Sequence, residues 1–516
     1  MSRFPFQIQM FVPELIHAIV LLACHGPILL RKTLHDLAVN MVGALHLARV
    51  EDPEAARALI RIQEELLAPD FMSLFGIQHS TWGDGLEMVT ISAQDHIESV
   101  DELTGLFNRV IEHSAASAGE WLRRDEGTDV LTSALASANV WRARWMSLIT
   151  SSAMHLWPAL QSRSFLIFSA LAPEFDEAFV THILTFLQSL LLSPEKHNKP
   201  ETAMVLHALG TLVPKLPQNS AYLPQLFWVA VGLIASTCNT LYAGAARLMK
   251  VVVEELHHRG AFDGGMASGL LEAREPVQKS VQEIEDLLYI SFDSSFSFAL
   301  AAIVFRGIRH PALRDSAEEA LRTLLQTNVH SMRHMRPSGD SVIRPLDEGS
   351  LAFVLALIPF STTAKSMIQL LHDADATAGW VELTEARTLR DASAHPILPL
   401  DMLGITDLRT AVLHSSLLIS MLPNAAGDTA ERDVILRVLC DTSASYPQVV
   451  AIACKHALNS QYVSCSCIRH AAFTNSRLTA VAASTTLSRA SSRAVRVKPC
   501  PLRSLFSACL FSTSVP

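Results

Sequence analysis

Charged side chains are scarce in this 516-residue chain, since Asp, Glu, Lys and Arg make up 18% of it against about 25% in an average soluble domain. Residues 216–246 contain none at all. The apolar stretch 226–235 within them is shorter than the roughly 20 helical residues that a bilayer requires. We therefore predict two buried helices joined by the polar turn 236–240, with no integral membrane span. A membrane protein is the alternative that this segment raises.

Acidic residues are missing from the end of the sequence. Residues 461–516 contain seven Lys or Arg and no Asp or Glu, so residues 1–460 carry −16 within a net charge of −9. An acidic body argues against a nucleic-acid binder, because a phosphate footprint needs clustered Lys and Arg. The Ser-, Ala- and Arg-rich tail is predicted to be disordered. Contact with acidic lipid or nucleic acid is its functional interpretation, and an error of gene prediction is the alternative.

The chain also lacks the short motifs of common catalytic sites. We find no G-x-x-x-x-G-K-[ST], G-x-G-x-x-G, H-E-x-x-H or G-x-S-x-G, and we predict no catalytic residue, no cofactor and no metal. His330 and His334 have the spacing of two metal ligands on one helix face. No third ligand is near them in the sequence, so we interpret them as a solvated pair. Cys465 and Cys467, in the tail, are an equally weak metal signal.

Cysteine usage and the N-terminal residues bear on the compartment. The first residues, MSRFPFQIQMFVPE, lack the apolar core and small-residue cleavage site of a signal peptide. Half of the eight cysteines fall in predicted apolar helices, as small buried hydrophobes do in a reducing compartment. We therefore expect a cytoplasmic protein. These four cysteines are Cys24, Cys238, Cys440 and Cys454.

Apolar residues at helical spacing are abundant, and Pro or Gly separates one run from the next. One predicted helix places Arg31 among its polar residues, opposite an apolar stripe. At least a dozen such helices follow one another, with almost no strand-like alternation. The stripe of that helix comprises Leu30, Leu34, Leu37, Met41 and Leu45.

The spacing between successive helix pairs predicts the fold class. A rhythm of roughly 40 residues per pair is typical of HEAT or armadillo repeats. Each pair has apolar surface on more than one side, which only neighbouring pairs can cover. We predict an all-α, HEAT/armadillo-like α-solenoid over residues 1–460 with a disordered tail over 461–516. A compact α-bundle is the alternative.

The sequence also predicts loops, helix caps and one candidate interaction surface. Residues 257–269 and 330–348 are predicted to be loops, the first beginning with a basic helix end at His257 and His258. Ser294 and Ser295, among Phe292, Phe296 and Phe298, are predicted to be N-caps with core aromatics around them. A candidate interaction surface, for an acidic partner or for self-association, precedes Pro311, with a solvated helix edge as its alternative. It comprises Arg306, Arg309 and His310.

Four stretches resemble neurofibromin and the related large fungal Ras regulators, in the helical region that follows their lipid-binding module. The odd Phe/Ser pattern of the last stretch, and its spacing from the third, are the most specific features. The resemblance spans about residues 10–330 and continues more weakly to about 458. The stretches are VPELIHAIVLLACHGPILLR (12–31), QLFWVAVGL (225–233), LYAGAARLM (241–249) and FDSSFSFALAAIVFRGIRHP (292–311).

The resemblance implies a segment of a Ras GTPase-activating protein. In that family an arginine of the catalytic domain stabilises charge on the transferred phosphoryl group, and that domain lies upstream of the matching region. No arginine-finger loop is found here, so no catalytic residue is assigned. The expected function is a non-catalytic scaffold in negative regulation of Ras signalling, with Ras-pathway proteins or a second copy as partners. An independent adaptor or transport scaffold unrelated to Ras is the alternative.

Overall fold

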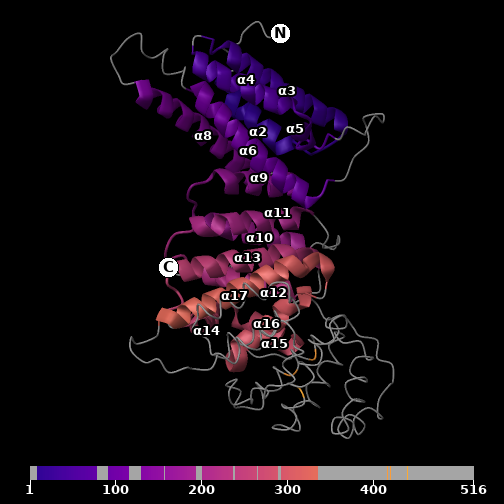
Figure 1. Cartoon of the computed structure of the whole chain (residues 1–516), viewed down its shortest axis with the longest axis vertical. Coiled ribbons are helices and arrows are strands. Elements are labelled where there is room, and N and C mark those ends of the chain that lie inside the picture. The colour runs from indigo at the N-terminus through magenta and orange to yellow at the C-terminus, as the bar shows by residue number, and fades with distance from the viewer. Residues whose placement is uncertain are drawn as a thin grey trace, which may run out of the picture. The chain divides into compact units, whose positions relative to one another are not determined.

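The computed structural model describes residues 9–334 except 51, 78–90, 116–129, 156, 193–199, 236–238, 264, 289–291 and 309, together with Ser415, Ile419 and Leu439. Every element in this part of the chain is a helix, which confirms the all-α prediction (Figure 1). The solenoid arrangement and the boundary at residue 460 stay predictions. The chain divides into two compact units, Met1–Pro217 and Gln218–Pro516.

Proline sets the start of several helices in the first unit. Pro53, Pro69 and Pro158 each stand at the first position of a helix, where the missing N–H has no partner to lose. The helices of the unit are η1 (Gln9–Phe11), α2 (Val12–Leu22), α3 (Ile28–Leu47), α4 (Pro53–Leu67), α5 (Pro69–Ser73), α6 (Ala93–Ala115), α8 (Val130–His155), α9 (Pro158–Leu171), α10 (Glu177–Leu192), α11 (Pro200–Leu212) and η2 (Val213–Lys215).

Helix α9 is covered by other helices of the first unit around its residues 161–169. It packs against α2, α6, α8 and α11. It also contacts α10, where the ring centroids of Phe165 and Phe179 lie 5.7 Å apart. Its residues 161–169 are buried without interruption. A helix with no solvent-facing side must find internal partners for its polar residues, and α9 contains both Gln161 and Arg163.

The second unit contains the charge-free segment. The predicted pair of buried helices is confirmed as α12 (Tyr222–Ala235) and α13 (Asn239–His258), which pack on each other. Helix α12 is buried along almost its whole length. Within the described residues, every helix falls short of the length and apolarity that a bilayer span needs. The other helices are α14 (Met266–Glu272), η3 (Glu275–Val277), α15 (Gln278–Leu288), α16 (Phe292–Ile308), η4 (Pro311–Leu313) and α17 (Arg314–His334).

Two predicted loop segments are partly helical. Helix α14 begins at Met266, inside the predicted loop 257–269, and α17 continues to His334, inside the predicted connector 330–348. Helix α14 has only seven residues, which is too short to display a period of 3.6.

Two side-chain assignments were also wrong. The apolar periodicity predicts a polar face for Arg31, but Arg31 is 2% exposed, whereas Leu30 of the predicted apolar stripe is 39% exposed. Ser294 and Ser295 lie inside α16 rather than before it, because the helix begins at Phe292. The N–H of Phe292 donates to Glu285 Oε1 at 2.6 Å. A glutamate of α15 therefore accepts a hydrogen bond from the first N–H of α16.

Candidate functional site

Buried and half-buried donors of one segment bond the last carbonyls of another helix at several places in the described part of the chain. The last four C=O groups of an α-helix have no partner within the helix, and glycine caps commonly satisfy them. Here long polar side chains do so, and each one fixes where two segments meet. The pairs are Arg163 with Val20 of α2, His35 with Leu66 of α4, Arg49 with His113 of α6, Gln161 with Ala153 of α8, Lys215 with Ser169 of α9, and Trp228 with Leu270 of α14.

Arg163 makes three side-chain hydrogen bonds and is the centre of the candidate site. Its side chain is fully buried. Nε donates to Val20 O at 2.7 Å and Nη2 donates to Ser99 Oγ at 2.8 Å. Nη1 donates to His96 Nδ1 at 3.1 Å. One guanidinium of α9 thus joins the end of α2 to the first turns of α6. We call the following residues the Arg163 cluster: Cys24, His25, Arg31, His96, Ser99 and Arg163.

The contact with Arg163 requires His96 to be neutral at Nδ1, and burial disfavours a charge on both imidazoles of the cluster. An arginine only donates hydrogen bonds, so His96 Nδ1 must carry a lone pair. The ring of His25 lies 5.0 Å from that of His96, and its Nδ1 is 3.2 Å from Ala23 O, to which it donates. Burial, reinforced by the Arg163 charge, lowers the pKa of His96 to about 3 and that of His25 to about 4.

The loop after α2 and the turn after α5 close the cluster. Cys24 has a φ of 67°, a conformation uncommon outside glycine, and its Sγ donates to Leu74 O at 3.0 Å. Arg31 Nη1 donates to Gly76 O at 3.2 Å. Gly76 has a φ of +70°, and a Cβ there would lie 2.8 Å from Arg31 Nη1. The positive φ therefore favours glycine at this turn, and a Cβ would also lie 2.3 Å from Ile91 Cδ1.

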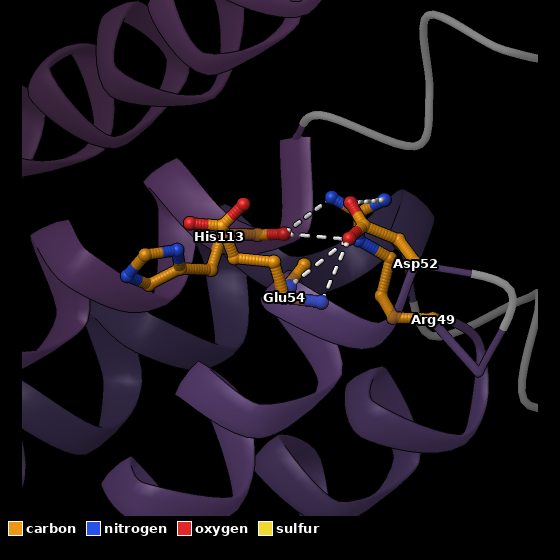
Figure 2. A network of polar contacts seen from close by, with 5 residues as sticks. Arg49, Asp52, Glu54 and His113 are labelled. Atoms are coloured by element: carbon orange, nitrogen blue, oxygen red, sulfur yellow. Dashed lines mark hydrogen bonds and ion pairs between the residues drawn. The ribbon is translucent and has the colours of Figure 1, made fainter.

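A second joint of the same kind connects α3, α4 and α6 (Figure 2). Arg49 donates to His113 O from Nε at 2.9 Å and from Nη2 at 2.6 Å. Its Nη1 lies 3.3 Å from Asp52 Oδ2. The other carboxylate oxygen of Asp52 accepts from the N–H groups of Glu54 and Ala55, both at 3.1 Å, as an N-cap does. The 2%-exposed Arg49 and the Asp52 cap together fix three helix ends.

The second unit contains a group of packed aromatic rings, as the first unit does at Phe165, Phe168 and Phe179. The ring of Trp228 meets that of Phe292 edge-on at 5.1 Å and that of Phe227 at 5.2 Å. Tyr242 donates its hydroxyl to Val304 O, and its ring lies directly over Gly307, where any Cβ would overlap it. We call the following residues the aromatic core: Phe227, Trp228, Tyr242, Phe292, Phe296 and Gly307.

The structure describes only part of the predicted interaction surface. Arg306 is in the last turn of α16, Arg309 lies outside the described residues, and His310 is exposed before η4. Their role as an interaction surface stays a prediction. His330 and His334 are in the last two turns of α17, while Cys465 and Cys467 lie outside the described residues. The part that the structure describes brings no three His, Cys, Asp or Glu together as a metal would require.

Sequence reasoning missed the Arg163 cluster, although one signal for it was present. Arg163 stands in QSRSFLIFSAL, where no face of a helix is polar enough to carry a solvated charge. An arginine in such a helix must be bonded internally. Its partners were not visible, because they lie 64 to 143 residues away in the chain.

Over its described residues the chain is thus all-helical. Its buried polar side chains form hydrogen bonds that join one helix to another. No protein-family model matches it. Its sequence is similar to inhibitory regulator protein IRA2 of Saccharomyces cerevisiae, with 20% identity over 331 residues. The alignment covers 62% of this chain and 10% of IRA2, so the chain spans about a tenth of that relative's length.

The stretches that resemble the Ras regulators contribute buried residues to both units. Three of them supply α12, α13 and α16, and with these the aromatic core. The fourth supplies α2 and, with Cys24, His25 and Arg31, half of the Arg163 cluster. Likeness at buried positions reflects how helices pack, so the function has to be argued from other observations.

Proposed function

We propose that this chain is a non-catalytic helical-repeat scaffold segment of a neurofibromin-like Ras GTPase-activating protein, and that it contributes to negative regulation of Ras signalling through protein contacts. The observation that carries the proposal is the similarity to a yeast protein named as an inhibitory regulator, over 62% of this chain. The four stretches that resemble fungal Ras regulators support the same assignment.

The chemistry of the described residues supports a scaffold. A GTPase activator needs an arginine that reaches the phosphoryl group of another protein's nucleotide. Arg163 and Arg49 are buried, and each spends its donors on carbonyls or side chains of its own unit. Arginines used in this way hold helices in place, which leaves the outer faces for partners.

The proposed partners are proteins of the Ras pathway or a second copy of the chain, in the cytoplasm. Arg306, Arg309 and His310 are the proposed docking residues, because three basic residues stand close together in the sequence before Pro311. A partner that contacts them would present acidic side chains.

The test combines a turnover assay with an affinity capture. The purified chain is mixed with Ras and GTP, and hydrolysis is compared with that of Ras alone; we expect equal rates. The tagged chain is then used to capture proteins from a fungal lysate, beside a variant in which the docking residues are Arg306→Glu, Arg309→Glu and His310→Glu.

We expect the unaltered chain to recover Ras or a polypeptide with a Ras-GAP domain, and the triple variant to recover less. Faster GTP hydrolysis would overturn the non-catalytic assignment. Recovery of coat or cargo proteins, with no Ras-pathway protein, would favour the independent adaptor.

A further inference from the structure

We propose that the Arg163 cluster is an acid-sensitive latch, in which protonation of His96 and His25 releases the end of α2 from α6 and α9. The inference does not depend on the proposed function. It rests on the hydrogen bond between Arg163 Nη1 and His96 Nδ1, which exists only while His96 is neutral. A proton on Nδ1 would turn this contact into two donors facing each other.

The surroundings of the two rings would oppose the added charge. The charged groups that act on His96 are Arg163, His25 and Arg31, and those that act on His25 are Arg163 and Arg31. The nearest carboxylates on α6, Asp95 and Glu98, are exposed and accept from Ser92 N and Gln94 Nε2. Protonation would therefore add positive charge beside two guanidinium groups in a buried site.

Other titratable groups on the helices around α6 are engaged or placed elsewhere. Glu14 pairs with Arg144, Glu65 with Arg109, and Glu112 with Arg142. Apart from Arg31 and Arg163, no group on these helices is among the charges that act on His96 or His25. Those still unnamed are His17 (α2), Lys32, Asp36 and His46 (α3), Arg57, Arg61 and Glu64 (α4), and Glu201 and His207 (α11).

The pH window follows from the direction of the shifts. Both histidines have a folded pKa below the ordinary 6.5, so the opened state binds more protons. The latch is intact above about pH 6.5 and weakens as the pH falls toward 4 and then 3. Linkage predicts that its opening becomes roughly 20-fold easier for each histidine between pH 7 and pH 5.

The test is hydrogen exchange of the full chain, resolved by peptide and corrected for the intrinsic rate at each pH. We expect protection of residues 12–31 to fall by at least roughly 20-fold between pH 7 and pH 5, and protection of α11 to fall less. In the variant His25→Asn/His96→Asn the loss should be absent, because an amide can donate or accept in place of Nδ1 without titrating. His46→Asn, outside the cluster, is the matched control and should behave as the unaltered chain.

An equal pH-dependent loss in the double variant and in the unaltered chain would overturn the proposal. If the double variant does not fold, the single variants are measured, and the histidines of the unaltered chain are titrated by NMR with labelled imidazoles. Two rings should then stay neutral at pH 5. Protonation of every histidine at pH 5 without loss of structure would contradict the latch.

Discussion

Arg163 shows how one buried side chain decides the arrangement of three helices. Removing its three donors would leave Val20 O, Ser99 Oγ and His96 Nδ1 buried without partners, and each such loss costs about 1–3 kcal/mol. The cost of burying the guanidinium offsets part of this, so the net effect of the arginine is smaller than the sum.

Replacing the arginine therefore has a defined expected cost. Arg163→Met should lower the free energy of unfolding by about 3 kcal/mol, and Arg163→Lys by an intermediate amount, because one ammonium cannot reach three acceptors in a fork. Urea unfolding followed by circular dichroism measures both. Arg57→Met, on the exposed face of α4, should stay within about 0.5 kcal/mol of the unaltered chain. Equal stability of the Arg163 and Arg57 variants would contradict the assignment.

Glycine at position 307 is required by the tyrosine ring that lies on it. Gly307→Ala should destabilise the protein by about 1–3 kcal/mol, since its Cβ would overlap Tyr242. Gly105→Ala, in a helix where a Cβ meets nothing within 4 Å, should instead stabilise by up to about 1 kcal/mol. Thermal unfolding of the two variants separates these effects by sign. Combining Gly307→Ala with Tyr242→Ala should cost less than the sum of the single changes.

At the scale of elements, the helices could be predicted from sequence and the contacts between them could not. Pro53 and Pro158 set helix starts, and the spacing of apolar residues identified α12 and α13 as a buried pair. Periodicity failed for the seven-residue α14. It also misplaced Arg31, because a pattern within one helix contains no information on a carbonyl at Gly76. The Arg163 cluster escaped detection for the same reason.

The Asp52 cap gives a prediction for the start of α4. Asp52→Ala should destabilise the protein by about 1 kcal/mol, because the N–H groups of Glu54 and Ala55 lose their acceptor. Asp52→Asn should retain most of that stability, since its amide oxygen can still accept. Hydrogen exchange at the first turn of α4 would report the loss directly. Unchanged exchange in the alanine variant would mean that the cap contributes little.

At the scale of the molecule, each unit has its own interior, which contains the Arg163 cluster in the first unit and the aromatic core in the second. We expect a fragment of residues 1–217 to be helical and to unfold in one cooperative transition, because it contains all members of the Arg163 cluster. Circular dichroism during heating tests this. A helical spectrum that melts gradually, without a transition, would show that the first unit lacks a fixed interior.

The enclosure of α9 bears on how such a sequence can diverge. Because residues 161–169 of this helix are buried against its neighbours, a partner protein would contact the neighbouring helices instead. Substitutions on the outer faces of those neighbours can accumulate while the hydrogen bonds of α9 are retained. Two chains of low sequence identity could therefore share this buried helix while their outer surfaces differ.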